Sequence, residues 1–255
     1  MSCGAGNDEM YEERLRDTLP RVRRRIEVAA RRVGRDPEAV RIVTVTKGHG
    51  YEAVEAALEA GLRDLGENRL EKLEEKVGRT PDGAARWHMI GHLQRRKAPR
   101  VRGVADLVHS VDSVRLAQRL NGRGTASSDD AGGAVGPAEG DAAPLRILLQ
   151  VNASGEGSKS GFAPEELLDA MGRVLELPTL EVAGLMTMAP WTNDEEVLRR
   201  TFRRLRELRE EASMSVPGYG GMDLSMGMSN DFEIAVEEGS TIVRLGTVLL
   251  GERSE

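Results

Sequence analysis

Lys47 is the residue whose type and position most directly indicate chemistry in this sequence. It follows the β-branched run 41–46, and because side chains alternate along a strand, Val43, Val45 and Lys47 are expected on one face. If that face points into the fold, partial desolvation favours the neutral amine, which can attack an aldehyde to form a Schiff base. The ordinary alternative is a lysine that extends from a strand end into solvent.

Arg244 is a second cationic residue that is expected to point inward. It alternates with Ile242 and Gly246 along the last apolar run, which would place its guanidinium just below the turn at Gly246 and Thr247. A buried arginine requires a partner, and an ordinary carboxylate would serve. In pyridoxal phosphate sites, however, such an arginine also faces the pyridine nitrogen.

Two turns near the C-terminus are candidate phosphate-binding loops. In the segment 225–231, Ser229 or Asn230 is placed to cap a short helix, and the amides at a helix start can bind phosphate. Gly246 and Thr247 form the second turn, and loops in these positions commonly bind phosphate in barrel proteins. A plain helix cap would also explain Ser229. The convergence of both turns with the lysine and the arginine favours a binding site.

Other chemistries have less support. His88 and His92 are four residues apart but flank a strand end and a glycine, so no metal site is predicted. The one cysteine is Cys3, and the formal charge of −6 argues against a nucleic-acid binder. The sequence contains no apolar run of about 18 residues and no signal-peptide pattern. We therefore expect no membrane span and a cytoplasmic location.

Eight strand-like runs alternate with helix-like stretches along the chain. The strands are expected at 41–46, 64–66, 86–90, 107–111, 145–151, 180–185, 222–224 and 242–245. The helices are expected at 51–60, 69–77, 94–101, 113–121, 164–175, 194–212 and 231–238. This alternation predicts an α/β fold, a single (β/α)8 TIM-type barrel with an extra N-terminal helix. A doubly wound open sheet is the alternative, but the turn after the first strand does not complete its Gly-rich nucleotide motif.

One domain is expected, with two segments outside its regular structure. Residues 1–8 are predicted to form a disordered N-terminus and residues 9–255 the barrel domain. The barrel domain is expected to begin with an amphipathic helix, because apolar residues recur there at three- and four-residue steps. Pro20 is expected at the start of this helix or at a kink in it. The segment 122–144 is rich in Gly, Ala, Ser and Asp without apolar periodicity. It is predicted to be a disordered insertion at the end of the barrel opposite the site.

The candidate site residues belong to a longer series of motifs. These are 43–47 (VTVTK), 64–68 (DLGEN), 87–94 (WHMIGHLQ), 109–112 (HSVD), 149–152 (LQVN), 155–159 (GEGSK), 184–187 (GLMT), 224–229 (LSMGMS), 243–247 (VRLGT) and 251–253 (GER). Most lie near the end of an expected strand. In this order they resemble the family of pyridoxal phosphate homeostasis proteins, whose fold resembles the barrel domain of bacterial alanine racemase.

The resemblance implies a cofactor and a set of residues that bind it. Pyridoxal 5'-phosphate would form a Schiff base with Lys47, and Arg244 would face the pyridine nitrogen. The phosphate would be bound by Ser229, Gly246 and Thr247, next to the candidate Asn230. The resemblance also implies a pocket lined by Asn68, His88, Ser110, Asn152 and Met186. The sequence departs from the family at 48–50 (GHG), where a small polar residue and a proline are more usual, and in the length of the 122–144 insertion.

The resemblance further implies a role in vitamin B6 homeostasis rather than dedicated catalysis. An arginine at the pyridine nitrogen makes the ring a weaker electron sink. The racemase uses a second base, a tyrosine on a domain that this chain is too short to contain, and no motif marks Tyr11, Tyr51 or Tyr219 for that role. We expect a monomer that buffers the cofactor or supplies it to apo-enzymes.

Alternative functions remain open from the sequence alone. One is a pyridoxal-phosphate-dependent amino-acid racemase or related enzyme, with His88 or a tyrosine recruited as base. Another is a Schiff-base aldolase that acts on a phosphorylated sugar, which would not require Arg244 inside the barrel. A purely structural role ranks last, because it leaves the grouping of lysine, arginine and phosphate-type turns unexplained.

Overall fold

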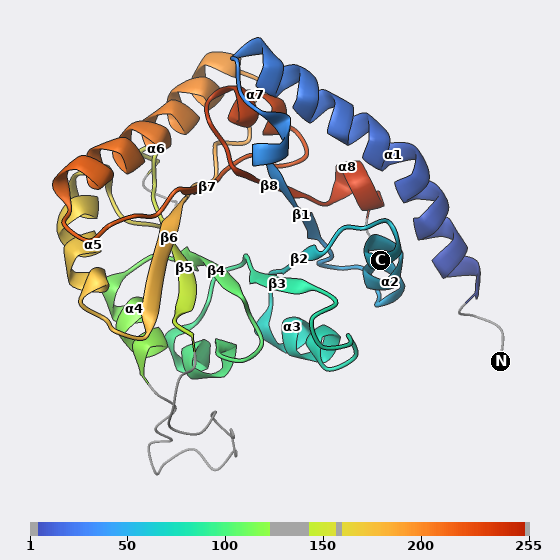
Figure 1. Ribbon diagram of the computed structural model, residues 1–255, viewed down its shortest axis with the longest axis horizontal. Helices are drawn as coiled ribbons and strands as arrows, with labels where there is room; N and C mark the ends of the chain where they lie inside the picture. Colours follow the sequence, from blue (N-terminus) through green and yellow to red (C-terminus); the bar gives the residue numbers. More distant parts are fainter. Residues whose placement is uncertain (1–4, 123–142, 157–159, 253–255) are drawn as a thin grey trace, which may run out of the picture.

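The computed structural model describes residues 5–122, 143–156 and 160–252, which form a closed barrel (Figure 1). Its strands are parallel and follow one another in chain order around the barrel, with the eighth pairing to the first. They are β1 (Arg41–Val45), β2 (Asp64–Glu67), β3 (Arg86–Met89), β4 (Leu107–Val111), β5 (Leu145–Gln150), β6 (Leu180–Met186), β7 (Asp223–Ser225) and β8 (Ile242–Leu245). The predicted (β/α)8 barrel is therefore confirmed.

Helices connect the strands and surround the barrel. The α-helices are α1 (Ala5–Arg32), α2 (Glu52–Glu59), α3 (Leu70–Val77), α4 (Val114–Asn121), α5 (Leu167–Leu175), α6 (Glu195–Ser215), α7 (Phe232–Glu237) and α8 (Thr247–Leu250). The short 3₁₀ helices are η1 (Pro37–Ala39), η2 (Arg95–Val101) and η3 (Pro164–Glu166). Local sequence sets several of these boundaries: Ser113 caps α4 by accepting from the amide of Leu116, and Asp194 caps α6. No helix among the described residues is long and apolar enough to span a membrane.

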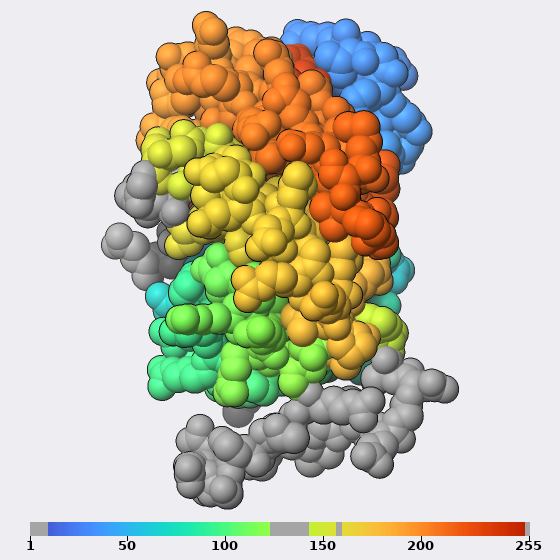
Figure 2. All heavy atoms as spheres, turned by 90° about the vertical axis from the view of Figure 1, so that its left-hand side faces the viewer, coloured from blue at the N-terminus to red at the C-terminus, as the bar shows by residue number. Residues whose placement is uncertain are grey.

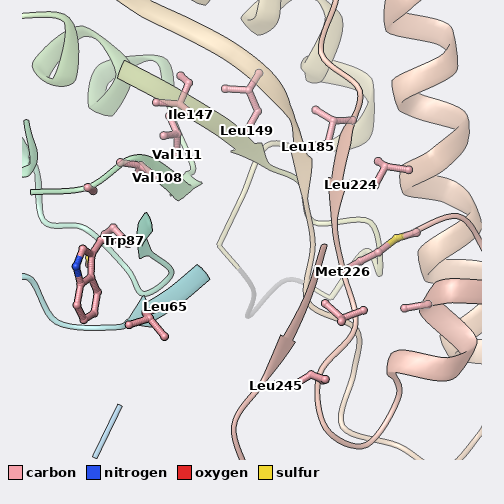
Figure 3. Packing of buried hydrophobic residues seen from close by; sticks show 14 of the residues in the cluster. Leu65, Trp87, Val108, Val111, Ile147, Leu149, Leu185, Leu224, Met226 and Leu245 are labelled. Atoms are coloured by element: carbon pink, nitrogen blue, oxygen red, sulfur yellow. The ribbon is translucent and has the colours of Figure 1, made fainter. Parts of the chain in front are cut away.

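Alternation of side chains along the strands divides the apolar core into two parts. The inner part lies within the barrel and includes Val43, Leu107, Leu148, Met186 and Ile242. The larger part lies between the strands and the helices, where the strands, and Met226 just after β7, contribute the residues labelled in Figure 3. Each strand is thus buried on both faces, which is typical of a parallel barrel.

The outer layer is continuous around much of the barrel. In Figure 2, α4, α5 and α6 lie side by side on one face of the molecule. The long α1 covers another part and packs against α2, α7 and α8 (Figure 1). α7 and α8 precede and follow β8 in the chain, and both contact α1. α1 therefore packs the N-terminal part of the chain against its C-terminal part.

Several predicted boundaries differ from the structure. α1 continues through Pro20 rather than starting there, and it includes residues 5–8, which were expected to be disordered. The predicted helix at 94–101 is a 3₁₀ segment with Pro99 inside it, because proline removes an amide that an α-helix would use. α8 was not predicted, since four residues are too short to show a helical period. Of the predicted insertion 122–144, residues 123–142 lie outside the described residues.

Candidate cofactor-binding site

A pocket opens at the C-terminal ends of the barrel strands, where enzymes and binding proteins of this fold carry their sites. It encloses about 780 Å³ and is called here the mouth pocket. Part of the predicted set lines it, namely Lys47, Asn68, Ser229, Asn230, Arg244, Gly246 and Thr247. Arg244 comes from β8 itself, and the others come from the loops after β1, β2, β7 and β8. The fold thus brings together groups that are up to 200 positions apart, as Lys47 and Thr247 are.

Lys47 lies in the turn directly after β1 and is half-buried. The backbone that precedes it is fixed by a buried ion pair: Lys76 Nζ donates to Glu67 Oε1 at 2.5 Å and to the carbonyl of Thr46 at 2.9 Å. The hydroxyl of Thr46 donates to the same glutamate oxygen at 2.8 Å. Gly48, with φ +78°, turns the chain immediately after the lysine. The base of the Lys47 side chain is therefore attached to a rigid part of the barrel.

Arg244 lies in β8 with its guanidinium inside the barrel and is 5% exposed. Nη1 donates to the carbonyl and hydroxyl oxygens of Ser225 at 2.8 and 2.6 Å, and Nη2 donates to the carbonyl of Thr187 at 3.0 Å. Burial lowers the pKa of Arg244 to about 10, while the charge of Asp231 raises it. The guanidinium therefore stays protonated at neutral pH, and its hydrogen bonds go to neutral oxygens rather than to a carboxylate.

The two loops predicted to bind phosphate are joined to each other. Ser229 Oγ, from the loop after β7, accepts a hydrogen bond from the amide of Val248 at 3.3 Å. The Arg244 amide donates to the carbonyl of Gly227 at 3.0 Å. Within the first loop, Asp231 accepts from the Met228 amide, and burial raises the pKa of the Asp231 carboxyl. The loops therefore form one connected wall of the mouth pocket.

The remaining predicted residues lie outside the lining of the mouth pocket. His88 is buried within the barrel, and Met186 belongs to the inner apolar cluster. Ser110 donates to the carbonyl of Gly91 at 2.6 Å, and Asn152 donates to the carbonyl of Glu156 at 2.8 Å. Ser110 thus contacts Gly91, which lines the mouth pocket.

The sequence did not single out the other lining residues. They are Val45, Ile90, Gly91, His92, Gln150, Ser160, Met188, Trp191 and Met228. Gln150 ends β5 and donates to the carbonyl of Ser160 at 2.9 Å, and a polar residue at the end of an apolar strand was a usable signal. Trp191 is 86% exposed and lies in a loop without periodicity, so the sequence held no signal for its place at the rim.

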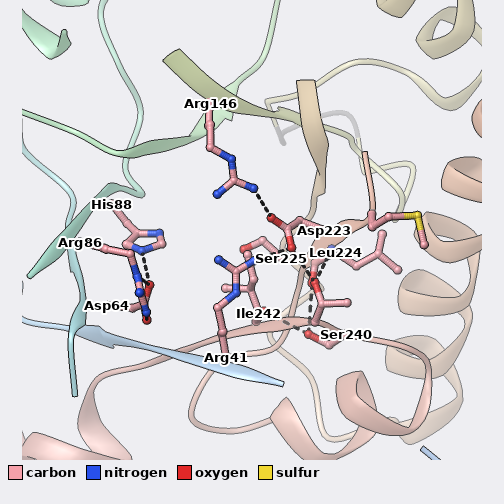
Figure 4. A network of polar contacts seen from close by, with 12 residues as sticks. Arg41, Asp64, Arg86, His88, Arg146, Asp223, Leu224, Ser225, Ser240 and Ile242 are labelled. Atoms are coloured by element: carbon pink, nitrogen blue, oxygen red, sulfur yellow. Dashed lines mark hydrogen bonds and ion pairs between the residues drawn. The ribbon is translucent and has the colours of Figure 1, made fainter. Parts of the chain in front are cut away.

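A polar network occupies the barrel interior below the mouth pocket. Figure 4 shows His88 directed toward Asp64 and Arg86, near the N-terminal ends of the strands. There Arg86 donates to Asp64 at 2.9 and 2.5 Å. Arg41 and Arg146 both contact Asp223 at the same end. Among the described residues no group of three or more His, Cys, Asp or Glu side chains is arranged to bind a metal ion.

The closed parallel barrel is also the fold of solved alanine racemases, to which this chain is 14–16% identical. Accordingly, the family described as alanine racemase, N-terminal domain, matches residues 18–254. The chain belongs to the family of pyridoxal phosphate homeostasis proteins. It is 39% identical to such a protein from Pseudomonas aeruginosa over 94% of this chain and 96% of the relative. It is 36% identical to one from Aquifex aeolicus over 93% and 97%.

A solved structure of the same kind carries a ligand. PipY of Synechococcus elongatus was solved with pyridoxal phosphate bound, and it superposes on this chain with a TM-score of 0.70. The two sequences are 30% identical, and the match covers 90% of this chain and all of PipY. The resemblance inferred from the motifs is therefore confirmed at the level of sequence and of fold.

Proposed function

We propose that this chain binds pyridoxal 5'-phosphate in the mouth pocket through the amine of Lys47, and that it buffers or supplies the cofactor in vitamin B6 homeostasis. The observation that carries the proposal is that Lys47 and Arg244 line one pocket together with the joined loops of Ser229 and Thr247. The names of the relatives and the ligand of PipY support the same function.

The residues of the mouth pocket fit the polar groups of the cofactor. Lys47 offers a primary amine for the aldehyde. Ser229 and Thr247 offer hydroxyl groups, and Asn230 an amide, for the phosphate. Arg244 offers N–H donors for the ring nitrogen. Ile90, Met188 and Trp191 supply apolar surface for the ring.

When bound, pyridoxal phosphate supplies an aldehyde that condenses with amines and a ring that withdraws electrons. In this chain Arg244 donates a hydrogen bond without releasing its proton, because its pKa stays near 10. Such a partner favours an unprotonated ring nitrogen and therefore weak electron withdrawal. The site is suited to retaining the cofactor more than to carbanion chemistry.

The surroundings of the mouth pocket support a carrier over a racemase. A racemase needs a second acid or base at the reacting carbon. Tyr11 bonds to His49, and Tyr51 donates to the carbonyl of Arg79 at 2.8 Å. Burial raises the pKa of Tyr219 to about 12. None of these tyrosines is among the lining residues of the mouth pocket.

The proposal includes a monomer in the cytoplasm that passes the cofactor to apo-enzymes. The mouth pocket is open, and Trp191 at its rim is 86% exposed, so a second protein can approach the cofactor. Light scattering on the purified protein should give a mass close to 27.8 kDa. A stable dimer would contradict the monomer but not the binding site.

Lys47→Ala tests the site. Adding pyridoxal phosphate to the wild-type protein should produce a visible absorption band. Borohydride should reduce the Schiff base, which removes this band and leaves a permanent adduct, with the added mass on the peptide that contains Lys47. The variant should lack the permanent adduct, because it has no amine at this position. The matched control is Lys72→Ala, which removes an exposed lysine paired with Glu75 and should keep the adduct. A wild-type protein that gains no band would reject the proposal.

A further inference from the structure

A continuous hydrogen-bond chain runs through the barrel from its N-terminal end to the mouth pocket. Asp64 Oδ1 lies 3.0 Å from His88 Nε2, and His88 Nδ1 lies 2.9 Å from His109 Nε2. His109 Nδ1 lies 2.8 Å from Ser225 Oγ, which accepts from Arg244 Nη1 at 2.6 Å. All five side chains are buried, and they come from five different strands, so the chain exists only in the closed barrel.

The carboxylate end of this chain is a hydrogen-bond acceptor. Burial raises the pKa of Asp64, but the hydrogen bonds from Arg86 and His88 outweigh burial and hold that pKa well below its usual range. An ionised carboxylate can only accept. His88 Nε2 therefore carries a hydrogen and donates to Asp64.

The other end is a hydrogen-bond donor. A guanidinium has N–H donors and no acceptor, so Arg244 donates to Ser225 Oγ. With that oxygen already accepting one bond, its own hydrogen is available for His109 Nδ1, 2.8 Å away. The only hydrogen bonds of Ser225 Oγ among the described residues are these two.

The proton positions between the two ends follow from pairing each donor with one acceptor. If Ser225 donates to His109 Nδ1, neutral His109 carries its hydrogen on Nε2 and donates to His88 Nδ1, which leaves His88 neutral as well. The reverse arrangement would make His109 a donor to Ser225 and His88 a cation, with hydrogens on both ring nitrogens. It would also leave the Ser225 hydroxyl hydrogen without an acceptor among the described residues.

The electrostatics favour the first arrangement. Burial lowers the pKa of His109 well below its usual value, and the positive charges of Arg244 and Arg41 act in the same direction, so this ring is neutral. The reverse arrangement would add a second cation, His88, to the barrel interior that already holds Arg244, which costs free energy in a region of low dielectric constant. Every donor of the first arrangement has one acceptor, and every bond points from Arg244 toward Asp64.

We infer that Asp64, His88, His109 and Ser225 are positioning residues for Arg244, because together they fix Ser225 Oγ as an acceptor and so orient the guanidinium toward the mouth pocket. This inference rests on the proposed function for the role of Arg244 at the ring nitrogen. Ser225 and Thr187 accept three N–H bonds of Arg244. A guanidinium has five such groups, which leaves donors for the pocket.

The first test needs no variant and no cofactor. Long-range proton–nitrogen correlation spectra report the tautomer of each imidazole, and the sequence contains only four histidines. At neutral pH, His88 and His109 should both be neutral with the hydrogen on Nε2. An Nδ1–H tautomer of His109, or a charged His88, would overturn the inferred direction. This result is independent of whether pyridoxal phosphate binds.

The second test asks whether the chain connects to the cofactor site. Saturating the wild-type protein with pyridoxal phosphate should shift the Nδ1 nitrogen resonance of His109, and Ser225→Ala should abolish that shift. The variant should also weaken binding of pyridoxal phosphate roughly 3- to 10-fold, the usual effect of one lost hydrogen bond. Ser240→Ala is the matched control, because its buried hydroxyl contacts the carbonyls of Leu224, Met226 and Ile242 rather than the chain.

The outcomes separate the inference from the proposed function. If the wild-type protein does not bind pyridoxal phosphate, the proposed function fails, and the tautomers still decide the direction of the chain. If the wild-type protein binds but His109 does not respond, the positioning role is wrong. Equal effects of Ser225→Ala and Ser240→Ala on affinity would also overturn it, since a general loss of packing would then explain both.

Discussion

At the scale of single residues, alternation along the strands was enough to identify Lys47 and Arg244 as inward-facing groups. Both line the mouth pocket as expected. No role was predicted for His109, which the sequence presents only as part of the motif 109–112. Its partners, His88 and Ser225, are 21 and 116 positions away. Such a contact depends on barrel closure and carries no local signal.

Trp191 provides a residue-scale prediction for ligand binding. The sequence has two tryptophans, of which Trp191 lies at the rim of the mouth pocket and Trp87 is 4% exposed in the core. In a Trp87→Phe protein, pyridoxal phosphate should quench the remaining fluorescence strongly, because its absorption overlaps tryptophan emission and Trp191 is adjacent. A Trp191→Phe protein should show weaker quenching. Equal quenching in the two proteins would place the cofactor elsewhere.

At the scale of elements, the ends of the strands were predicted to within one residue because each is a short apolar run between turn residues. The helices with a clear apolar stripe, such as α4, were also found. The sequence did not predict α8, which has four residues, and it predicted a helix at η2 without its 3₁₀ character. α8 nevertheless shapes the site, since the amide of Val248 bonds to Ser229.

Gly227→Ala tests the importance of the loop after β7. Gly227 has φ +94°, and an added Cβ would lie 2.6 Å from Ala235 Cβ, so the loop cannot keep its path. We expect the free energy of unfolding to fall by about 1–3 kcal/mol and the affinity for pyridoxal phosphate to fall with it.

Urea unfolding and a binding titration measure the two effects of Gly227→Ala. Gly220→Ala is the control, because a Cβ at Gly220, in the segment just before β7, has nothing within 4 Å. If both variants behaved like the wild-type protein, the path of the loop after β7 would not depend on the glycine.

At the scale of the whole molecule, the two ends of the barrel differ, because ion pairs fill one end and a pocket opens at the other. The N-terminal end is closed by ion pairs of Arg41, Arg86 and Arg146 with Asp64 and Asp223 (Figure 4). The C-terminal end opens into the mouth pocket. The sequence predicted the barrel but not the difference between its two ends. That difference depends on which inward-pointing residues of separate strands meet, and this is known only once the barrel is closed. The hydrogen-bond chain through His88 and His109 connects the two ends.

The buried His109 makes the stability of the whole barrel depend on pH. Its pKa in the folded protein is well below the usual value of 6.5, so an unfolded chain binds a proton that the folded one does not. Its contribution to stability is therefore complete above about pH 6.5 and is lost as the pH falls. The free energy of unfolding should decrease below that value with a limiting slope of about 1.4 kcal/mol per pH unit.

Urea unfolding between about pH 7.5 and pH 5.5 measures this slope, because the window lies above the usual carboxyl range. The low pKa of Asp64 acts in the same direction but only near its usual value of 3.8 and below. His109→Gln should be less stable near neutral pH, since a buried hydrogen bond is lost, yet its stability should depend less on pH. A wild-type protein whose stability is constant across the window would show that His109 is accessible to protons in the folded state, and the neutral hydrogen-bond chain would then be wrong.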